Sequence, residues 1–308
     1  MQKHCILVGA PVDSGQRTPG CLMGPSAYRV AGLPAIMKDL GHEVEDWGDA
    51  APQPGQGNAA VNPAVHAQPE TVAWTQGLAQ ISQRAMGAGF PIFMGGDHSM
   101  SLGTVAGVAA YAKAQGRPLY ILWLDAHSDF HTPLSTDSGH FHGMPVAYIA
   151  GLKGFEAFPA FPAPVPPQRI CLFGIRSVDQ AEHDALQRLD LAVNDMRVLD
   201  ERGIVAPLRE FLHTVAKDNG LLHVSLDVDF LDPTIAPGVG TTVPGGATFR
   251  EAHLVMELLH EHDLVTSLDL AELNPFLDER GRTARLMVDL VASLMGRKVF
   301  DRPTMRYS

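Results

Sequence analysis

Residues 121–131 read ILWLDAHSDFH, an apolar run that ends at Leu124 and is followed by Asp125, His127 and Asp129. The apolar run predicts a buried strand, and in an extended segment residues two apart point to the same side. The three polar side chains can therefore converge just beyond the carboxyl end of the strand, which is where open parallel sheets place their sites. Taken alone, the same residues could also form an ordinary polar surface turn.

Two further segments end in polar residues of the same kind. Residues 223–233, HVSLDVDFLDP, run into Asp227 and Asp229, and residues 91–99, PIFMGGDHS, run into a glycine pair and His98. The glycines allow the backbone to turn closely. Because the carboxyl ends of parallel strands meet at one edge of a sheet, we expect these side chains to lie near those of the first segment.

Four aspartates that meet in a partly dry site cannot all stay ionised without cations, because like charges repel there and force protonation. Their charges balance two divalent ions, with His98 and His127 as neutral ligands. A carboxylate-rich set without cysteine favours Mn²⁺ over Zn²⁺, although Fe²⁺, Co²⁺ and Ni²⁺ also fit. Two such ions about 3.5 to 4 Å apart would hold a bridging water as hydroxide near neutral pH, which predicts a hydrolase. The competing interpretation, a calcium loop at residues 227–238, fails because its twelfth position is Gly238 rather than a glutamate.

Short apolar strands alternate with helical patterns along the chain, which predicts an α/β fold with a mostly parallel sheet and helices on both faces. The predicted strands are Cys5–Val8, Pro91–Met94, Leu119–Leu124, Ile170–Phe173, Leu222–Leu226 and Val265–Leu270. The clearest helices are Pro207–Asn219 and Thr248–His262, the second opening with the capping-box pair Thr248 and Glu251. We expect Ala51–Gln68 and Phe155–Gln168 to be surface loops of one domain that spans residues 1–308.

The composition limits the classes of partner. The chain has 308 residues, 45% of them hydrophobic, and a formal net charge of −11. This charge argues against a nucleic acid or an acidic membrane surface as partner and suits a small cationic substrate, although acidity can also serve solubility alone. Three cysteines predict neither a disulfide framework nor a thiolate zinc site, so a reducing cytoplasm is expected. The first apolar run is too short for a signal or membrane segment.

Five segments, in this order, resemble the ureohydrolase family and most closely its arginases. They are GAPVDSGQRTPGCLMGPSAYRVAGL (9–33), GGDHSMSLG (95–103), DAHSDFHTPLSTDSGHFHGMP (125–145), SLDVDFLDPTIAPGVGTTVPGG (225–246) and SLDLAELNP (267–275). The resemblance implies an arginase-like three-layer fold and a homo-oligomer, a trimer or a hexamer. It also implies two Mn²⁺ ions with six ligands: His98, Asp125, His127, Asp129, Asp227 and Asp229.

The resemblance further implies a reaction. Hydroxide that bridges the metal ions attacks the guanidinium carbon, the ions and Asp129 stabilise the tetrahedral intermediate, and urea and an amine are released, the amine being L-ornithine when the substrate is L-arginine. His142 matches the residue that moves protons or protonates the leaving amine, Glu272 matches the carboxylate that orients the guanidinium, and Thr241 matches a residue lining the same pocket. Without the resemblance, His142 would be read as a loop residue and Glu272 as a surface charge at a strand end.

The residues that meet the far end of the substrate follow the arginase pattern only in part. Ser138 keeps the pattern at the α-carboxylate, and Asp179 and Glu182 match positions near the α-amino group, although acids also suit a solvated helix start. His131 and His140 stand where asparagines usually help hold the carboxylate, and Ser177 replaces a common acid. Agmatinase or guanidinobutyrase activity is therefore the alternative, followed by formimidoylglutamase. A deacetylase-like amide hydrolase and a catalytically silent metal-binding scaffold are the alternatives from other classes.

Overall fold

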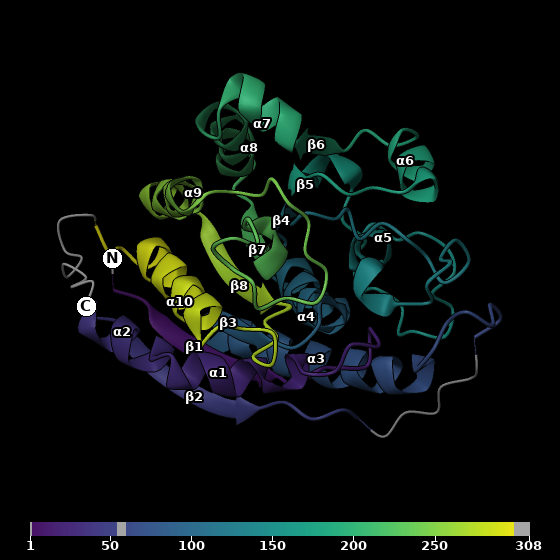
Figure 1. Ribbon diagram of the computed structural model, residues 1–308, viewed down its shortest axis with the longest axis horizontal. Coiled ribbons are helices and arrows are strands. Elements are labelled where there is room, and N and C mark those ends of the chain that lie inside the picture. The colour runs from purple at the N-terminus through teal and green to yellow at the C-terminus, as the bar shows by residue number, and fades with distance from the viewer. Residues whose placement is uncertain (1, 54–59, 299–308) are drawn as a thin grey trace.

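An eight-stranded sheet, parallel throughout, forms the centre of the structure (Figure 1). The structure is a computed structural model and describes residues 2–53 and 60–298. The strand order is β2-β1-β3-β8-β7-β4-β5-β6. The strands are β1 (His4–Ala10), β2 (Glu43–Asp49), β3 (Phe90–Gly95), β4 (Leu119–Leu124), β5 (Ile170–Ile175), β6 (Ala192–Asp195), β7 (Leu221–Asp227) and β8 (Val265–Ala271).

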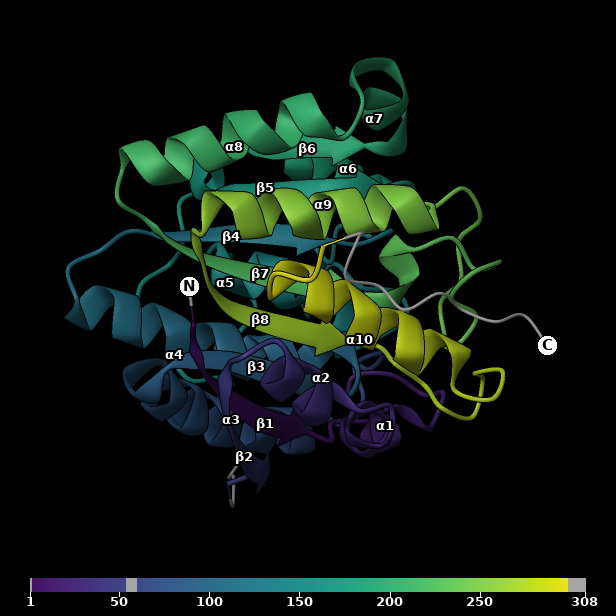
Figure 2. The same ribbon diagram turned by 90° about the vertical axis from the view of Figure 1, so that its left-hand side faces the viewer.

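Helices cover both faces of this sheet (Figure 2). Helices α3 to α6 pack on one face, and α1, α2 and α7 to α10 pack on the other. The helices are α1 (Gly24–Val30), α2 (Leu33–Asp39), α3 (Gln68–Ala88), α4 (Ser101–Ala114), α5 (Pro145–Ile149), α6 (Gln180–Leu186), α7 (Met196–Arg202), α8 (Val205–Lys217), α9 (Phe249–His262) and α10 (Arg282–Leu294). The described residues also form short 3₁₀ helices: η1 (Cys21–Met23), η2 (His98–Met100), η3 (Phe141–Gly143), η4 (Pro167–Arg169) and η5 (Val228–Phe230).

The apolar run of β4 shows why helices must pack on both faces of the sheet. Leu122 and Leu124 belong to the hydrophobic cluster on one face, whereas Ile121 and Trp123 belong to the cluster on the other. A strand that is buried on both faces has a continuous apolar sequence rather than an alternating one. The parallel sheet with helices on both faces confirms the predicted fold class, and the extent of the domain over residues 1–308 stays a prediction.

All six predicted strands are present, and each lies within the observed strand or matches it. The predicted capping box of α9 is also present, with Thr248 accepting from the backbone N–H of Glu251. The two edge strands, β2 and β6, were not predicted, because their residues are largely exposed or half-buried and lack an apolar run. The loop predicted for Ala51–Gln68 is wrong at its end, since Gln68 begins α3, and its residues 54–59 lie outside the described residues.

Four neighbouring strands, β3, β8, β7 and β4, occupy the middle of the sheet. Because the strands are parallel, their carboxyl ends lie at the same edge, and the polar segments predicted from the sequence follow these ends. Among the described helices, none combines the length and the apolar character needed to cross a membrane.

Candidate metal centre and substrate cavity

The turn after β3 places His98 at the carboxyl edge of the sheet. A side chain at Gly96 would collide with the backbone of Val12, so the close approach predicted for the glycine pair is real. Asp97 then caps η2 by accepting from the N–H of Ser99, and its other oxygen accepts from the N–H of Gly15 at 2.8 Å. These contacts fix the direction in which His98 leaves the turn.

The first ligand group surrounds Nδ1 of His98. This nitrogen lies 2.9 Å from Oδ2 of Asp227, 3.1 Å from Oδ2 of Asp125 and 3.3 Å from Oδ2 of Asp129. All four side chains are buried. Carboxyl groups from the ends of β4 and β7 thus meet the imidazole that follows β3, as the sequence predicted.

The second ligand group surrounds His127. Its Nδ1 lies 3.0 Å from Oδ2 of Asp229 and 3.5 Å from Oδ1 of Asp125. Asp125 therefore points one oxygen at each histidine and is shared by the two groups, each of which can hold a cation. Thr241 donates its hydroxyl to Oδ2 of Asp229 at 3.1 Å, which places this predicted pocket residue beside the second group.

The geometry differs from the extended strand ends expected from the sequence. Asp129 has a left-handed backbone, with φ of 49°, and Asp229 lies in the 3₁₀ helix η5 rather than in a strand. Simple alternation of side chains is therefore the wrong reason for their convergence. Turns after the strands bring these side chains together instead. The side chain of Asp227 caps one of these turns by accepting from the N–H of Asp229 at 2.7 Å.

Two residues that the sequence analysis missed orient the ring of His98. Nε2 lies 2.7 Å from the hydroxyl of Ser225, and the ring stacks on Trp123 with 4.1 Å between centroids. When Nε2–H donates to Ser225, the lone pair of His98 lies on Nδ1 and faces the carboxylates. The signal for Ser225 was a lone hydroxyl inside an apolar strand two positions before Asp227.

Crowding perturbs the titration of these groups. Burial is the largest influence on the pKa of Asp227 and Asp129, and neighbouring carboxylates add to it, so both values rise well above their ordinary range. Burial opposes protonation of His98, but its bond to Asp125 and the charge of Asp129 raise its pKa to about 9. Without cations, protons must therefore offset the negative charge of the cluster.

These residues fit a pair of divalent cations. Nδ1 of His98 and Oδ2 of Asp125 are buried and lie 3.1 Å apart, and among the described residues neither has a hydrogen-bond partner of ordinary geometry, as expected of two ligand atoms of one ion. The donors are carboxylate oxygens and imidazole nitrogens without any thiolate, a set that suits Mn²⁺ and its divalent neighbours.

Glu272 and His142 form a pair behind the ligands. Glu272 follows β8, has φ of 64° and is only 1% exposed. Its Oε1 accepts from the backbone N–H of His98 at 2.7 Å and lies 3.0 Å from Nδ1 of His142. A surface charge at a strand end, the alternative interpretation of Glu272, is therefore excluded by its burial.

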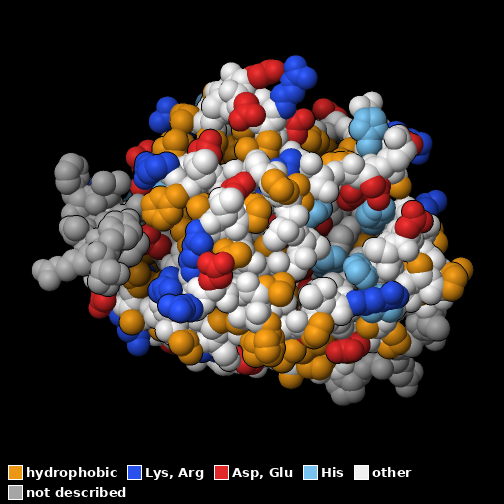
Figure 3. Space-filling view, in the orientation of Figure 1, with side chains coloured by type: hydrophobic (Ala, Val, Ile, Leu, Met, Phe, Trp, Pro, Cys, Tyr) orange, Lys and Arg blue, Asp and Glu red, His pale blue; other side chains and the backbone are white. Residues whose placement is uncertain are grey.

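A cavity of about 270 Å³ opens onto the candidate metal ligands, and histidine side chains gather around a hollow in the face shown in Figure 3. The lining includes most of the predicted site residues: His98, His127, Asp129, His131, Ser138, His142, Asp179, Glu182, Asp227, Asp229 and Thr241. Among the described residues, Asp125, His140 and Glu272 do not line it. The ring of His140 instead packs edge-on against His66 and His142, and burial together with their charges lowers its pKa to about 4.

The outer wall of the cavity carries the acids expected near the substrate amino group. Asp179 and Glu182 form a capping box at the start of α6, so the helix-start interpretation also holds. Glu182 is buried and accepts from the hydroxyl of Ser128 at 2.6 Å. Oδ2 of Asp179 lies 2.6 Å from Nε2 of His131. The histidine that stands where arginases usually have an asparagine thus contacts a predicted substrate-binding acid.

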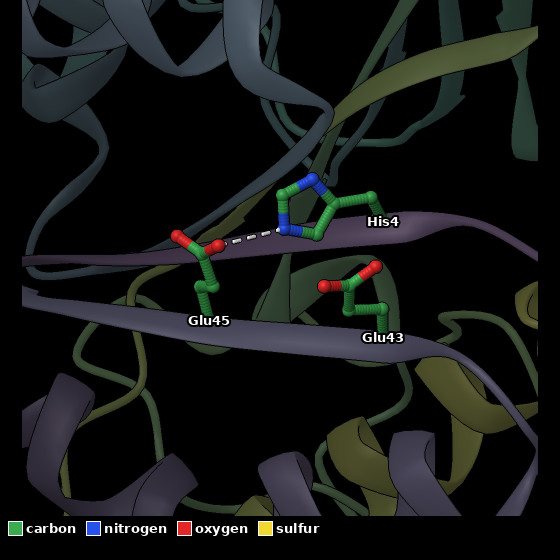
Figure 4. Close-up of side chains that lie close together, drawn as sticks. All are labelled: His4, Glu43 and Glu45. Carbon is green, nitrogen blue, oxygen red and sulfur yellow. Dashed lines mark hydrogen bonds and ion pairs between the residues drawn. The ribbon is translucent and has the colours of Figure 1, made fainter.

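A different group of potential ligands lies at the amino ends of β1 and β2 (Figure 4). His4 and Glu45 form an ion pair at 3.1 Å, with side chains 31% and 52% exposed, and Glu43 lies beside them. Water screens charges at this edge, so the group does not need a cation as the buried cluster does. We interpret it as a surface ion pair.

Comparison with known proteins agrees with the site. The model of the Arginase family matches residues 3–296. The chain is 56% identical to the arginase of Brucella melitensis over 305 residues, which is 99% of this chain and 100% of the relative. It is also 56% identical to the arginase of Agrobacterium fabrum, over 98% of this chain and 94% of the relative. The solved structure of arginase from Bacillus caldovelox superposes with a TM-score of 0.88 at 35% identity, covering 97% of this chain and 100% of that chain. The chain therefore belongs to the arginase family and is an arginase-type ureohydrolase.

Proposed function

We propose that this chain hydrolyses L-arginine to urea and L-ornithine with the help of two Mn²⁺ ions. Membership of the arginase family supports the overall reaction. The observation that carries the two-ion centre is the position of Asp125, which is shared by two ligand groups at the carboxyl edge of the sheet. The residues that would hold the ions are His98, Asp125, His127, Asp129, Asp227 and Asp229.

Bound cations would neutralise the negative charge of the buried carboxylates. When bound by these residues, the ions would supply Lewis-acid chemistry and would lower the pKa of a coordinated water molecule. Asp129 lies in the cavity wall, where a carboxylate oxygen can accept a hydrogen bond from a guanidinium N–H. The buried carboxylates also attract the cationic end of the substrate and exclude anions.

His142 is placed to hold and move a proton. It lines the cavity, while its Nδ1 lies 3.0 Å from Glu272. Burial opposes protonation of His142, but the charge and hydrogen bond of Glu272 raise its pKa. The imidazole therefore keeps a proton more readily near neutral pH, and its other nitrogen can donate that proton to the leaving amine.

The far wall of the cavity supports an amino-acid substrate. Ser138 offers a hydrogen-bond donor for a carboxylate, His131 holds Asp179 in place, and Asp179 and Glu182 offer charge for an ammonium group. The side chains of Ser138, His131 and Asp179 share the cavity lining with the metal ligands, so one extended molecule can reach both ends. The expected homo-oligomer and the cytoplasmic location stay predictions.

A urea assay tests the proposal. Protein loaded with Mn²⁺ is given L-arginine, agmatine or guanidinobutyrate, and urea is measured for each. We expect urea from L-arginine at the highest kcat/KM; preference for either other guanidine would favour the agmatinase or guanidinobutyrase alternative, and no urea from any of them would refute the proposal. His98→Ala and Asp229→Ala should each lower both metal content and turnover, because each removes a proposed ligand.

A further inference from the structure

Arg176 follows β5 and points its guanidinium under the loop that carries Thr241. Its Nε and Nη2 donate to the carbonyl oxygen of Val243 at 3.1 and 2.8 Å. Nη2 also donates to the carbonyl oxygen of Asp229 at 2.6 Å, and Nη1 donates to that of Gly174 at 3.2 Å. The guanidinium thus connects the loop to the backbone of a proposed metal ligand.

The backbone of Arg176 makes a third connection. Its N–H and that of Ser177 both donate to the carbonyl oxygen of Ala126, at 2.8 and 3.0 Å. Ala126 lies between the proposed ligands Asp125 and His127. One residue therefore holds together the segments that follow β4, β5 and β7, together with the loop at residues 239–244.

The loop at residues 239–244 is hydrogen-bonded to the rest of the protein at both of its ends. Before it, the carbonyl of Gly238 accepts from the N–H of Asn274 at 2.8 Å, and after it, Gly245 donates to Asp232 at 2.8 Å. Between these anchors, in the described part of the chain, side-chain hydrogen bonds join Thr241 to Asp229 and Arg176 to the carbonyl oxygen of Val243. Val239 at the start of the loop is buried in the hydrophobic core, so without the guanidinium the later part of the loop would keep its bond from Thr241 to Asp229.

From these contacts we propose that Arg176 is a positioning residue for the reaction, which acts by holding residues 239–244 and Thr241 against the turn of Asp229. The inference rests on the proposed function, because it assigns Thr241 to the substrate cavity. Its guanidinium suits the task, since a planar fork donates several bonds in fixed directions, whereas a lysine ammonium does not reproduce that geometry. In the described part of the chain, the acceptors of these bonds are backbone carbonyls.

The test uses Arg176→Lys, which keeps the charge but loses the fork, in the full Mn²⁺-loaded protein. Limited proteolysis with thermolysin, well below the unfolding temperature, should cut this variant within residues 239–244 while the unaltered chain resists. The KM for L-arginine should rise about tenfold or more with a smaller change in kcat, because Thr241 would no longer be held in its place in the substrate cavity. Arg197→Lys, at an exposed arginine paired with Glu201, is the matched control and should change neither result.

A second variant reaches the same contact from the other side. A methyl group at Gly246 would lie 2.6 Å from Nη2 of Arg176 and 2.6 to 2.7 Å from the backbone of Leu231 and Asp232, so Gly246→Ala should displace the guanidinium together with this backbone and reproduce the cleavage and the higher KM. Resistance of both variants to thermolysin, or a lower kcat with unchanged KM, would overturn the inference. Proteolysis needs no substrate, so a chain that released no urea would refute the proposed function while the role of Arg176 was still being measured.

Discussion

The imidazole of His98 lies parallel to the indole of Trp123, with 7° between the ring planes. The indole blocks one face of the imidazole, and the hydroxyl of Ser225 holds its Nε2 at 2.7 Å. A ring that is fixed at a face and at one nitrogen has a single direction left for its other nitrogen. That direction is toward Asp227, Asp125 and Asp129.

Ser225→Ala should weaken metal binding by about 10-fold to 100-fold, because the acceptor that places the lone pair on Nδ1 of His98 is lost. Competition with a chelator measures the affinity. Ser267→Ala is the control, since Ser267 is equally buried and makes the same kind of contact with His223, at 2.8 Å, away from the proposed ligands. If both variants bind Mn²⁺ as the unaltered chain does, Ser225 has no part in orienting His98.

Removal of the metal should destabilise the folded protein. Ions that bind only the folded state add about 2.7 kcal/mol per site at a free concentration 100 times Kd. Urea unfolding of chelator-treated protein should therefore have a lower midpoint than unfolding of the Mn²⁺-loaded protein, and re-addition of Mn²⁺ should restore it. Equal midpoints at saturating Mn²⁺ would contradict the two-ion centre.

The sequence predicted the strands that are buried on both faces. A short uninterrupted apolar run such as Ile121 to Leu124 is typical of a strand in the middle of a parallel sheet. It did not predict the edge strand β2, whose sequence EVEDWGD is polar. That strand exists because β1 offers it a parallel ladder from His4 to Gly9, which is a property of the assembled sheet. Edge strands are therefore hard to recognise from local sequence.

The convergence of the proposed metal ligands was also predictable, since the carboxylates and histidines follow three buried parallel strands whose carboxyl ends lie at one edge of the sheet. The backbone conformations of Asp129 and Glu272, both with positive φ, were not predictable, because the surrounding structure imposes them. Ser225 and Arg176 were missed for a related reason. Their partners lie 127 and 67 residues away, and a local pattern such as the lone hydroxyl of Ser225 in an apolar strand does not say which distant residue it contacts.

Glu272→Gln should lower turnover at least about 100-fold and leave metal content unchanged. An amide offers one acceptor oxygen and no charge, so it cannot hold the N–H of His98 and support a protonated His142 equally well. Turnover with L-arginine is compared with the Mn²⁺ content of the same sample. Glu251→Gln, in the exposed capping box of α9, serves as the control for the loss of a carboxylate. Unchanged turnover would remove the proposed role of Glu272.

A salt bridge between α1 and the edge strand should make stability depend on pH. Two hydrogen bonds from Arg29, at 2.7 and 2.9 Å, are the chief cause of the lowered pKa of Asp46. A carboxyl whose pKa is lower in the folded state stabilises the protein above its unfolded value, near 4, and loses this contribution as the pH falls through the folded value. Asp46→Asn should therefore reduce stability at neutral pH by about 1 kcal/mol or less and flatten the acid limb. Urea unfolding between pH 3 and 7 measures this, and Asp190→Asn, at an exposed acid, should leave the profile unchanged.

His131→Ala should weaken binding of the amino-acid end of the substrate without slowing the chemical step. Nε2 of His131 holds Oδ2 of Asp179, whose side chain is 52% exposed, while the other oxygen of this carboxylate accepts from the N–H of Glu182 at the start of α6. We expect the KM for L-arginine and the inhibition constant of L-ornithine to rise together by about tenfold, because the two molecules share this end and a hydrogen bond to a charged group is lost. His183→Ala, at an exposed histidine of α6 outside the cavity, should change neither constant. A fall in kcat with both binding constants unchanged would show that His131 serves the reacting end instead.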